Sequence, residues 1–163
     1  MLIGLAIGTL CERPLPCELQ VVQRLRLIAA SAKVIGELRR NLGRDDMKLL
    51  FNINAEFAHS LDQRPIELRA KSAVFSSLAD AILVSGPLTG QPVDQSQLRA
   101  VREAVSSVPI LANTGVNIDN VRDILSVADG VIIGTHFKRD GDTWNAVDGE
   151  RVKRFMDVVA KLR

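Results

Sequence analysis

The stretch that decides the fold reads VPILANTGVN over residues 108–117, and a second one, ADGVIIGT, follows it at residues 128–135. Each begins with an apolar run and ends in small positions that include glycine, a pattern typical of a buried parallel strand followed by a tight loop. The sequence predicts a helix directly after the first loop, beginning at residues 117–119. Because loop N–H groups and a helix N-terminus both attract negative charge, the two stretches together predict a phosphate site.

Outward from this pair, apolar runs alternate with amphipathic stretches. The runs at 47–54, 80–85, 108–112 and 130–133 predict strands, and the patterns at 19–40, 65–78, 94–105 and 148–162 predict helices. Such alternation indicates parallel strands joined by right-handed crossovers. No G-x-G-x-x-G motif follows the first strand, which disfavours a dinucleotide-binding sheet. The alternatives are an open sheet and part of a (β/α)8 barrel, of which four units are about half.

Composition narrows the class of protein. The chain has 163 residues, 47% of them hydrophobic, and a formal net charge of +2, so we expect one globular domain. Its basic residues are dispersed, which argues against nucleic-acid binding. Cys11 and Cys17 lack metal-ligand spacing and fit a reducing compartment, so we expect a cytoplasmic protein, with organelle import left open. The apolar run at 1–10 is too short to span a bilayer and lacks the basic start of a secretory signal.

Candidate ligand residues follow the predicted strands, at the sheet edge where α/β proteins bind ligands. The predicted phosphate-binding residues are Asn113, Thr114, Gly115, Gly134 and Thr135. Further ligand contacts are predicted at Asn52, Ser85, Gly86, Thr89, Gly90 and Lys138. The competing interpretation is that these glycines only end strands and that the polar residues only form turns.

Other polar residues are assigned by chemistry and position. His136 is the candidate general acid or base, with a surface or capping role as the alternative. Asp80 and Asp129 precede strands, at the end opposite the ligand loops, and are predicted to be structural. Trp144 is predicted to pack the last loop beneath the terminal helix. The sequence predicts no metal site and no cofactor, and whether the protein is an enzyme is left open.

Four stretches, taken together, resemble the BtpA family, whose name refers to photosystem I biogenesis. They are 79–86 with 89–90 and Pro92; 109–111 with 115–116 and 120–121; 128–135 with 137–141; and 144–145 with 147–148 and 151–152. The resemblance covers roughly residues 47–162. It implies a partial TIM barrel of the ribulose-phosphate-binding type, with phosphate held by the loops after the last two strands.

The sequence departs from the family in two places. Family members have further strands before the position of Met47, and their acidic, Lys-His-rich segment reads NINAEFAH here, at residues 52–59. We therefore divide the chain into an N-terminal segment, 1–46, and a (β/α)4 half barrel, 47–163. A half barrel exposes sheet edges, which predicts a homo-oligomer through those edges, an open sheet capped by the N-terminal helix, or a truncated and inactive product. The sequence favours the last. Residues 1–10 are a candidate replacement strand.

Two functions are compatible with this interpretation. The first is binding of a phosphorylated small molecule, with an unspecified reaction. The second is a non-catalytic assembly or stability factor, as the family name implies. Fold alone does not choose between them.

Overall fold

The computed structural model describes residues 4–5, 32–57 and 63–162. Its strands are β1 (Gly4–Leu5), β2 (Leu50–Asn52), β3 (Ala81–Ser85), β4 (Ile110–Asn113) and β5 (Gly130–Ile132). Its α-helices are α2 (Ala32–Asn41), α3 (Ile66–Ser77), α4 (Gln95–Ala104), α5 (Val121–Leu125) and α6 (Gly149–Ala160). Two 3-10 helices, η2 (Thr135–Phe137) and η3 (Arg139–Gly141), follow β5.

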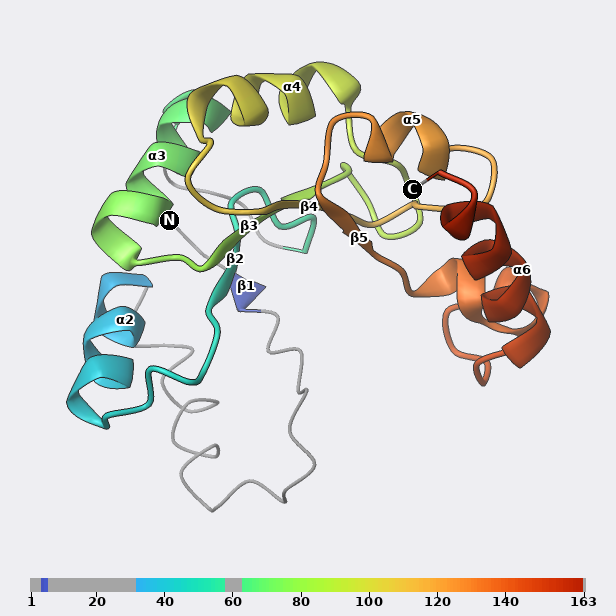
Figure 1. Ribbon diagram of the computed structural model, residues 1–163, viewed down its shortest axis with the longest axis horizontal. Coiled ribbons are helices and arrows are strands. Elements are labelled where there is room, and N and C mark those ends of the chain that lie inside the picture. Colours follow the sequence, from blue (N-terminus) through green and yellow to red (C-terminus); the bar gives the residue numbers. More distant parts are fainter. Residues whose placement is uncertain (1–3, 6–31, 58–62, 163) are drawn as a thin grey trace.

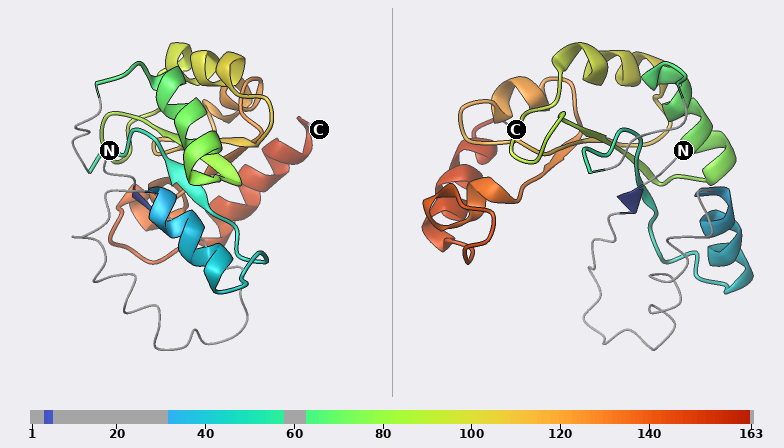
Figure 2. Two further views of the ribbon diagram at one scale, coloured as in Figure 1. Left: turned by 90° about the vertical axis from the view of Figure 1, so that its left-hand side faces the viewer. Right: turned by 180° about the vertical axis from the view of Figure 1, so that it is seen from behind.

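The strands form one sheet in the order β1-β2-β3-β4-β5. Strands β2 to β5 are parallel, and β1 pairs antiparallel with β2. Figures 1 and 2 show a curved sheet with α3, α4 and α5 along its convex side. The predicted alternation of strands and helices is therefore confirmed. This α/β arrangement is that of part of a (β/α)8 barrel.

The core lies between the sheet and its helices. Alternate strand residues such as Phe51, Ile82 and Ile110 are fully buried and pack in one cluster with Leu98 and Val101 of α4. This is the alternation expected when one face of each strand meets a helix layer. Residues on the opposite face of the sheet are less uniformly buried. Leu83 is buried, whereas Leu111, its partner on β4, and Ile132 on β5 are only half-buried. In the described ranges, β5 pairs with β4 alone, so its outer edge is open.

The N-terminal predictions are confirmed in part. Residues 4–5 form β1, which supplies the additional strand considered for residues 1–10. The predicted helix over 19–40 is described from Ala32 onward, as α2, and residues 19–31 lie outside the described ranges. Helix α2 packs closely on α3. The close approach is seen at Gly36, where a Cβ would lie only 2.9 Å from the carbonyl oxygen of Ser77. The division of the chain at residue 46 stays a prediction.

Asp80 and Asp129 play the predicted structural role, in equivalent positions. The carboxylate of Asp80 accepts from the Leu49 N–H at 2.8 Å and pairs with Arg39. Asp129 likewise accepts from the Ile110 N–H at 2.8 Å and pairs with Arg102. Burial raises the pKa of each carboxyl, but its N–H and guanidinium donors together lower that pKa by more, so both lie below their usual range. These carboxylates thus tie the start of each strand to its neighbour and to a helix.

Two further results concern exposure. The prediction that Trp144 packs beneath the terminal helix is wrong, because its side chain is 93% exposed. The turn at 142–145 is held instead by polar bonds, among them Asp142 accepting from the Trp144 N–H at 2.9 Å. Among the helices within 32–57 and 63–162, none is both long enough and apolar enough to cross a bilayer.

Candidate functional site

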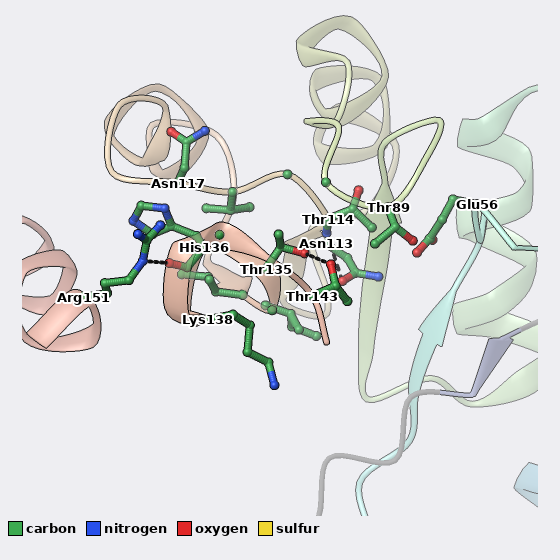
Figure 3. Close-up of a pocket in the computed structure, with 17 residues that line it drawn as sticks. Glu56, Thr89, Asn113, Thr114, Asn117, Thr135, His136, Lys138, Thr143 and Arg151 are labelled. Carbon is green, nitrogen blue, oxygen red and sulfur yellow. Dashed lines mark hydrogen bonds between the residues drawn. The ribbon is translucent and has the colours of Figure 1, made fainter. Parts of the chain in front are cut away.

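A cavity of about 390 Å³ lies beside the carboxyl ends of β4 and β5 (Figure 3). It collects most of the residues predicted from sequence: Thr89, Gly90, Asn113, Thr114, Gly115, Gly134, Thr135, His136 and Lys138. Asn52, Ser85 and Gly86 do not line it. The volume suits a small ligand rather than a dinucleotide.

The loop after β4 is held in an unusual backbone conformation. Thr114 and Gly115 have φ of 65° and 58°, two left-handed residues in succession. The Thr114 hydroxyl stabilises this turn, because it accepts from the Gly86 N–H at 2.7 Å and donates to the Gln91 carbonyl at 2.9 Å. The Asn113 carboxamide accepts from the Thr114 N–H at 3.0 Å. The loop is therefore fixed to the loop that follows β3.

The loop after β5 is anchored to α6. The His136 carbonyl accepts from the Arg151 guanidinium at 2.7 Å, and the Phe137 carbonyl accepts from the Asp148 N–H at 2.7 Å. The Thr135 and Thr143 hydroxyls share a hydrogen bond of 2.8 Å. Asp148 caps α6, because its side chain accepts from the N–H groups of Glu150 at 2.9 Å and Arg151 at 3.4 Å. One helix thus sets the position of the loop across the cavity from β4.

Three backbone donors of these loops have no internal acceptor. In the described part of the chain, no hydrogen bond uses the N–H groups of Gly115, Gly134 or Thr135, and all three residues line the cavity. Backbone N–H groups are normally paired or solvated. Donors left unpaired at a cavity wall are suited to an oxyanion.

The prediction that a helix begins at residues 117–119 is corrected, because these residues belong to a turn that precedes the helix. Helix α5 begins at Val121 and has only five residues. The intervening N–H groups bind side chains: Asn117 accepts from Asp119 at 2.9 Å and from Asn120 at 3.1 Å, and the Asn120 side chain accepts from the Asn117 N–H at 2.9 Å. Asn117 and Asn120 thus exchange side-chain bonds as in a capping box, and the Asn117 carbonyl accepts from the Val121 N–H at 3.1 Å. The anion-binding capacity of this loop therefore comes from Gly115 and not from a helix N-terminus.

A polar network lies behind the cavity wall and joins the ends of β2, β3 and β4. The buried Ser85 hydroxyl accepts from the Asn52 carboxamide at 2.7 Å and from the Asn113 carboxamide at 3.1 Å. The Asn54 carboxamide binds the Ser85 backbone twice, donating to its carbonyl and accepting from its N–H, both at 2.8 Å. Asn52 and Ser85 are each 2% exposed. In this structure their side chains position the loops and do not meet the cavity.

The electrostatics of the cavity differ from one wall to the other. Lys138 and Arg151 lie with His136 and Thr135 on one side, and Glu56 and Thr89 lie across from them (Figure 3). Burial and the charge of Arg151 lower the pKa of His136 from its ordinary value of 6.5, so the neutral imidazole predominates at pH 7. The ring also packs edge-on against Phe155, at 5.8 Å between centroids.

Sequence reasoning missed several residues that line the cavity. Three of them are Glu56, Thr143 and Arg151. Glu56 lies in the segment that departs from the family pattern, Thr143 lies in the loop before the last helix, and Arg151 lies on that helix. A detectable signal existed for Arg151, which follows the capping Asp148 by three residues and so lies in the first turn, beside the preceding loop. No comparable signal marks Thr143. Among the described residues, no group of histidine, cysteine or acidic side chains has the arrangement of a metal site.

Comparison with known proteins identifies the family. The model of the BtpA family matches residues 21–161. The chain belongs to the BtpA family. Among its BtpA-family relatives, the putative sgc region protein SgcQ of Escherichia coli is 43% identical over 132 residues, which are 79% of this chain and 49% of that protein. Photosystem I biogenesis protein BtpA of Synechocystis is 28% identical over 135 residues, 83% of this chain and 47% of that protein.

The BtpA-family chain also resembles a solved TIM barrel. The N-(5'-phosphoribosyl)anthranilate isomerase of Pyrococcus furiosus matches with a TM-score of 0.53 and 18% identity, over 81% of this chain and 58% of that one. This likeness shows the fold, a partial (β/α)8 barrel. The chain spans about half the length of the curated relatives it matches.

Proposed function

We propose that this protein binds the phosphate group of a small molecule in the cavity between the loops after β4 and β5. The N–H groups of Gly115, Gly134 and Thr135 donate to the phosphate oxygens, and Lys138 contributes positive charge. The observation that carries the proposal is that three residues with unpaired backbone N–H groups, from two successive β/α loops, line one cavity. This is the position at which TIM barrels commonly hold phosphate.

Two features of the cavity support an anion rather than a neutral ligand. The wall that carries Gly134 and Thr135 also carries Lys138 and Arg151, so fixed dipoles and positive charge act on the same volume. Burial and the charges of Arg151 and Arg154 lower the pKa of His136, and the contribution of the two arginines indicates a positive potential at this wall.

Calorimetric titration of the protein with inorganic phosphate tests the proposal. We expect saturable binding with one site per chain, which stabilises the native state and raises the thermal midpoint as phosphate increases. Sodium chloride at equal ionic strength is the control, because general screening of charge would act equally in both salts. Absence of saturable heat and of any shift specific to phosphate would contradict the proposal.

A second candidate, self-association, rests on a different observation. In the part of the chain that the structure describes, the outer edge of β5 is open, and an apolar groove of about 440 Å³ beside it is lined by residues that include Val131, Phe155 and Met156. Open strand edges pair readily with other chains. We propose that a second copy of this chain covers this face, and an assembly role would use the same surface.

Light scattering after size-exclusion chromatography tests self-association. We expect a particle of twice the 17.8 kDa chain mass. Met156→Glu, at a position that is 53% exposed, should shift the particle towards the monomer without unfolding it, because it adds charge to the groove without disturbing the core. A wild-type monomer at all concentrations would contradict the proposal.

A further inference from the structure

One carboxylate oxygen of a residue that lines the cavity lacks a hydrogen-bond partner. The Oε2 atom of Glu56 is buried and accepts no hydrogen bond in the described part of the chain. A buried acceptor without a donor costs free energy, so such atoms are rare in native structures, and a bound water molecule, an ion or a functional role is the usual explanation. Glu56 lines the cavity of the proposed phosphate site.

The segment that carries Glu56 is firmly held. It follows β2, and the two hydrogen bonds of 2.8 Å between Asn54 and the Ser85 backbone fix it to the end of β3. Ile53 and Ala55 are buried, at 3% and 6% exposure, and the Ile53 carbonyl accepts from Arg69 at 3.2 Å. The carboxylate therefore belongs to the residue that directly follows an anchored segment, residues 53–55. A preorganised acceptor of this kind contributes to specificity.

The cavity is consequently bipolar. Figure 3 shows Glu56 and Thr89 on the β2 side of the cavity, across from Thr135 and Lys138. One wall offers N–H donors and an ammonium group, and the other offers a carboxylate and a hydroxyl. A ligand that pairs with the groups of both walls needs an anionic end, which accepts from the N–H donors, and a hydrogen-bond donor at its other end, which binds the carboxylate.

We infer that Glu56 binds a hydroxyl group of the ligand and thereby selects phosphate monoesters that carry hydroxyl groups, such as a sugar phosphate, over simple phosphates. This inference rests on the proposed phosphate site and adds to it the chemistry of the ligand's other end. Thr89, whose hydroxyl can both donate and accept, also lines the cavity and suits a further hydroxyl of a polyol. A site built to bind a hydroxyl rejects an analogue that lacks it, because its own acceptor is then left unpaired.

Titration of the full chain with three probes tests the inference. We expect D-ribose 5-phosphate to bind about tenfold more tightly than ethyl phosphate or inorganic phosphate, the increment of a hydrogen bond to a charged group. Glu56→Gln keeps the shape of the side chain and removes its charge. In this variant we expect the tenfold preference to fall to about twofold or less, with inorganic phosphate bound at least as tightly as by the wild type, because a negative charge in the cavity wall is removed. Retained phosphate binding also reports that the variant is folded.

Glu103→Gln is the matched control, because Glu103 is exposed on α4 and lies outside this cavity. It should keep the preference of the wild-type protein. If wild type binds phosphate but does not prefer ribose 5-phosphate, or if Glu56→Gln keeps the preference, the inference is overturned while the phosphate site stands. Tighter binding of O-phosphoethanolamine than of ribose 5-phosphate would also overturn it, in favour of an ammonium ligand. If inorganic phosphate does not bind wild type at all, the proposed function itself fails.

Discussion

Gly115→Ala is expected to lower the free energy of unfolding by about 4 kcal/mol, the sum of overpacking and left-handed strain. A Cβ at this position would lie 2.1 Å from the carbonyl carbon of Gln91 and 2.2 Å from the nitrogen of Pro92. These are backbone atoms, which cannot rotate away as a flexible side chain could. The φ of 58° adds the left-handed cost that any residue with a Cβ incurs. The loop after β4 must therefore move away from the loop after β3, and the unpaired Gly115 N–H moves with it.

Denaturant unfolding monitored by circular dichroism measures this change. Gly43→Ala is the control, because Gly43 has nearly the same φ, 62°, but no atom lies within 4 Å of the place that a Cβ would take there. It should cost only about 1 kcal/mol, the conformational part alone. Equal losses in the two variants would mean that the close approach of the two loops, on which the site geometry depends, does not exist.

Gly134→Asp is expected to weaken phosphate binding at least about tenfold, since like charges a few ångströms apart repel strongly in a partly buried site. The position is suitable because no atom lies within 4 Å of a Cβ there and its φ is −115°, so the change introduces neither a clash nor left-handed strain. Stability should change little, by about 0.5 kcal/mol or less. The loss of affinity would therefore report on the site and not on folding.

Gly149→Asp provides the matched charge control for this variant. Gly149 also has no atom within 4 Å of a Cβ position, and it begins α6 outside the cavity lining. Calorimetric titration with phosphate should give nearly wild-type affinity for Gly149→Asp and a much weaker one for Gly134→Asp. Equal weakening of phosphate binding in both variants would mean that the effect comes from net charge and not from a phosphate-binding position at Gly134.

The architecture was predictable because it depends on local patterns. The continuous apolar run at 81–85 is buried on both faces, and the amphipathic stretches that flank it pack on one side of the sheet. The helices predicted to begin near residues 94 and 148 are capped by Asp94 and Asp148, and such a cap needs only its own residue and the N–H groups that follow. The family resemblance then related these elements to a barrel.

The parts that sequence reasoning missed depend on details of local hydrogen bonding or on contacts distant in sequence. The helix expected at 117 begins at Val121, after a turn that the reciprocal bonds of Asn117 and Asn120 cap, and helix propensity does not distinguish such a turn from the helix. Residue type alone favours burial of Trp144, but its turn is held by polar bonds. Glu56 reaches the cavity only because Asn54 binds Ser85, a residue thirty-one positions away.

The most direct test follows the backbone amides themselves during a titration with inorganic phosphate. In nitrogen-15 correlated spectra of the labelled protein, we expect the resonances of Gly115, Gly134 and Thr135 to shift together and to saturate at one common dissociation constant. The amides of Asp119 and Asn120, which already bind Asn117, should move little. If the three resonances remain still while phosphate binds, or move with different constants, then no single oxyanion contacts both loops and the proposed site is wrong.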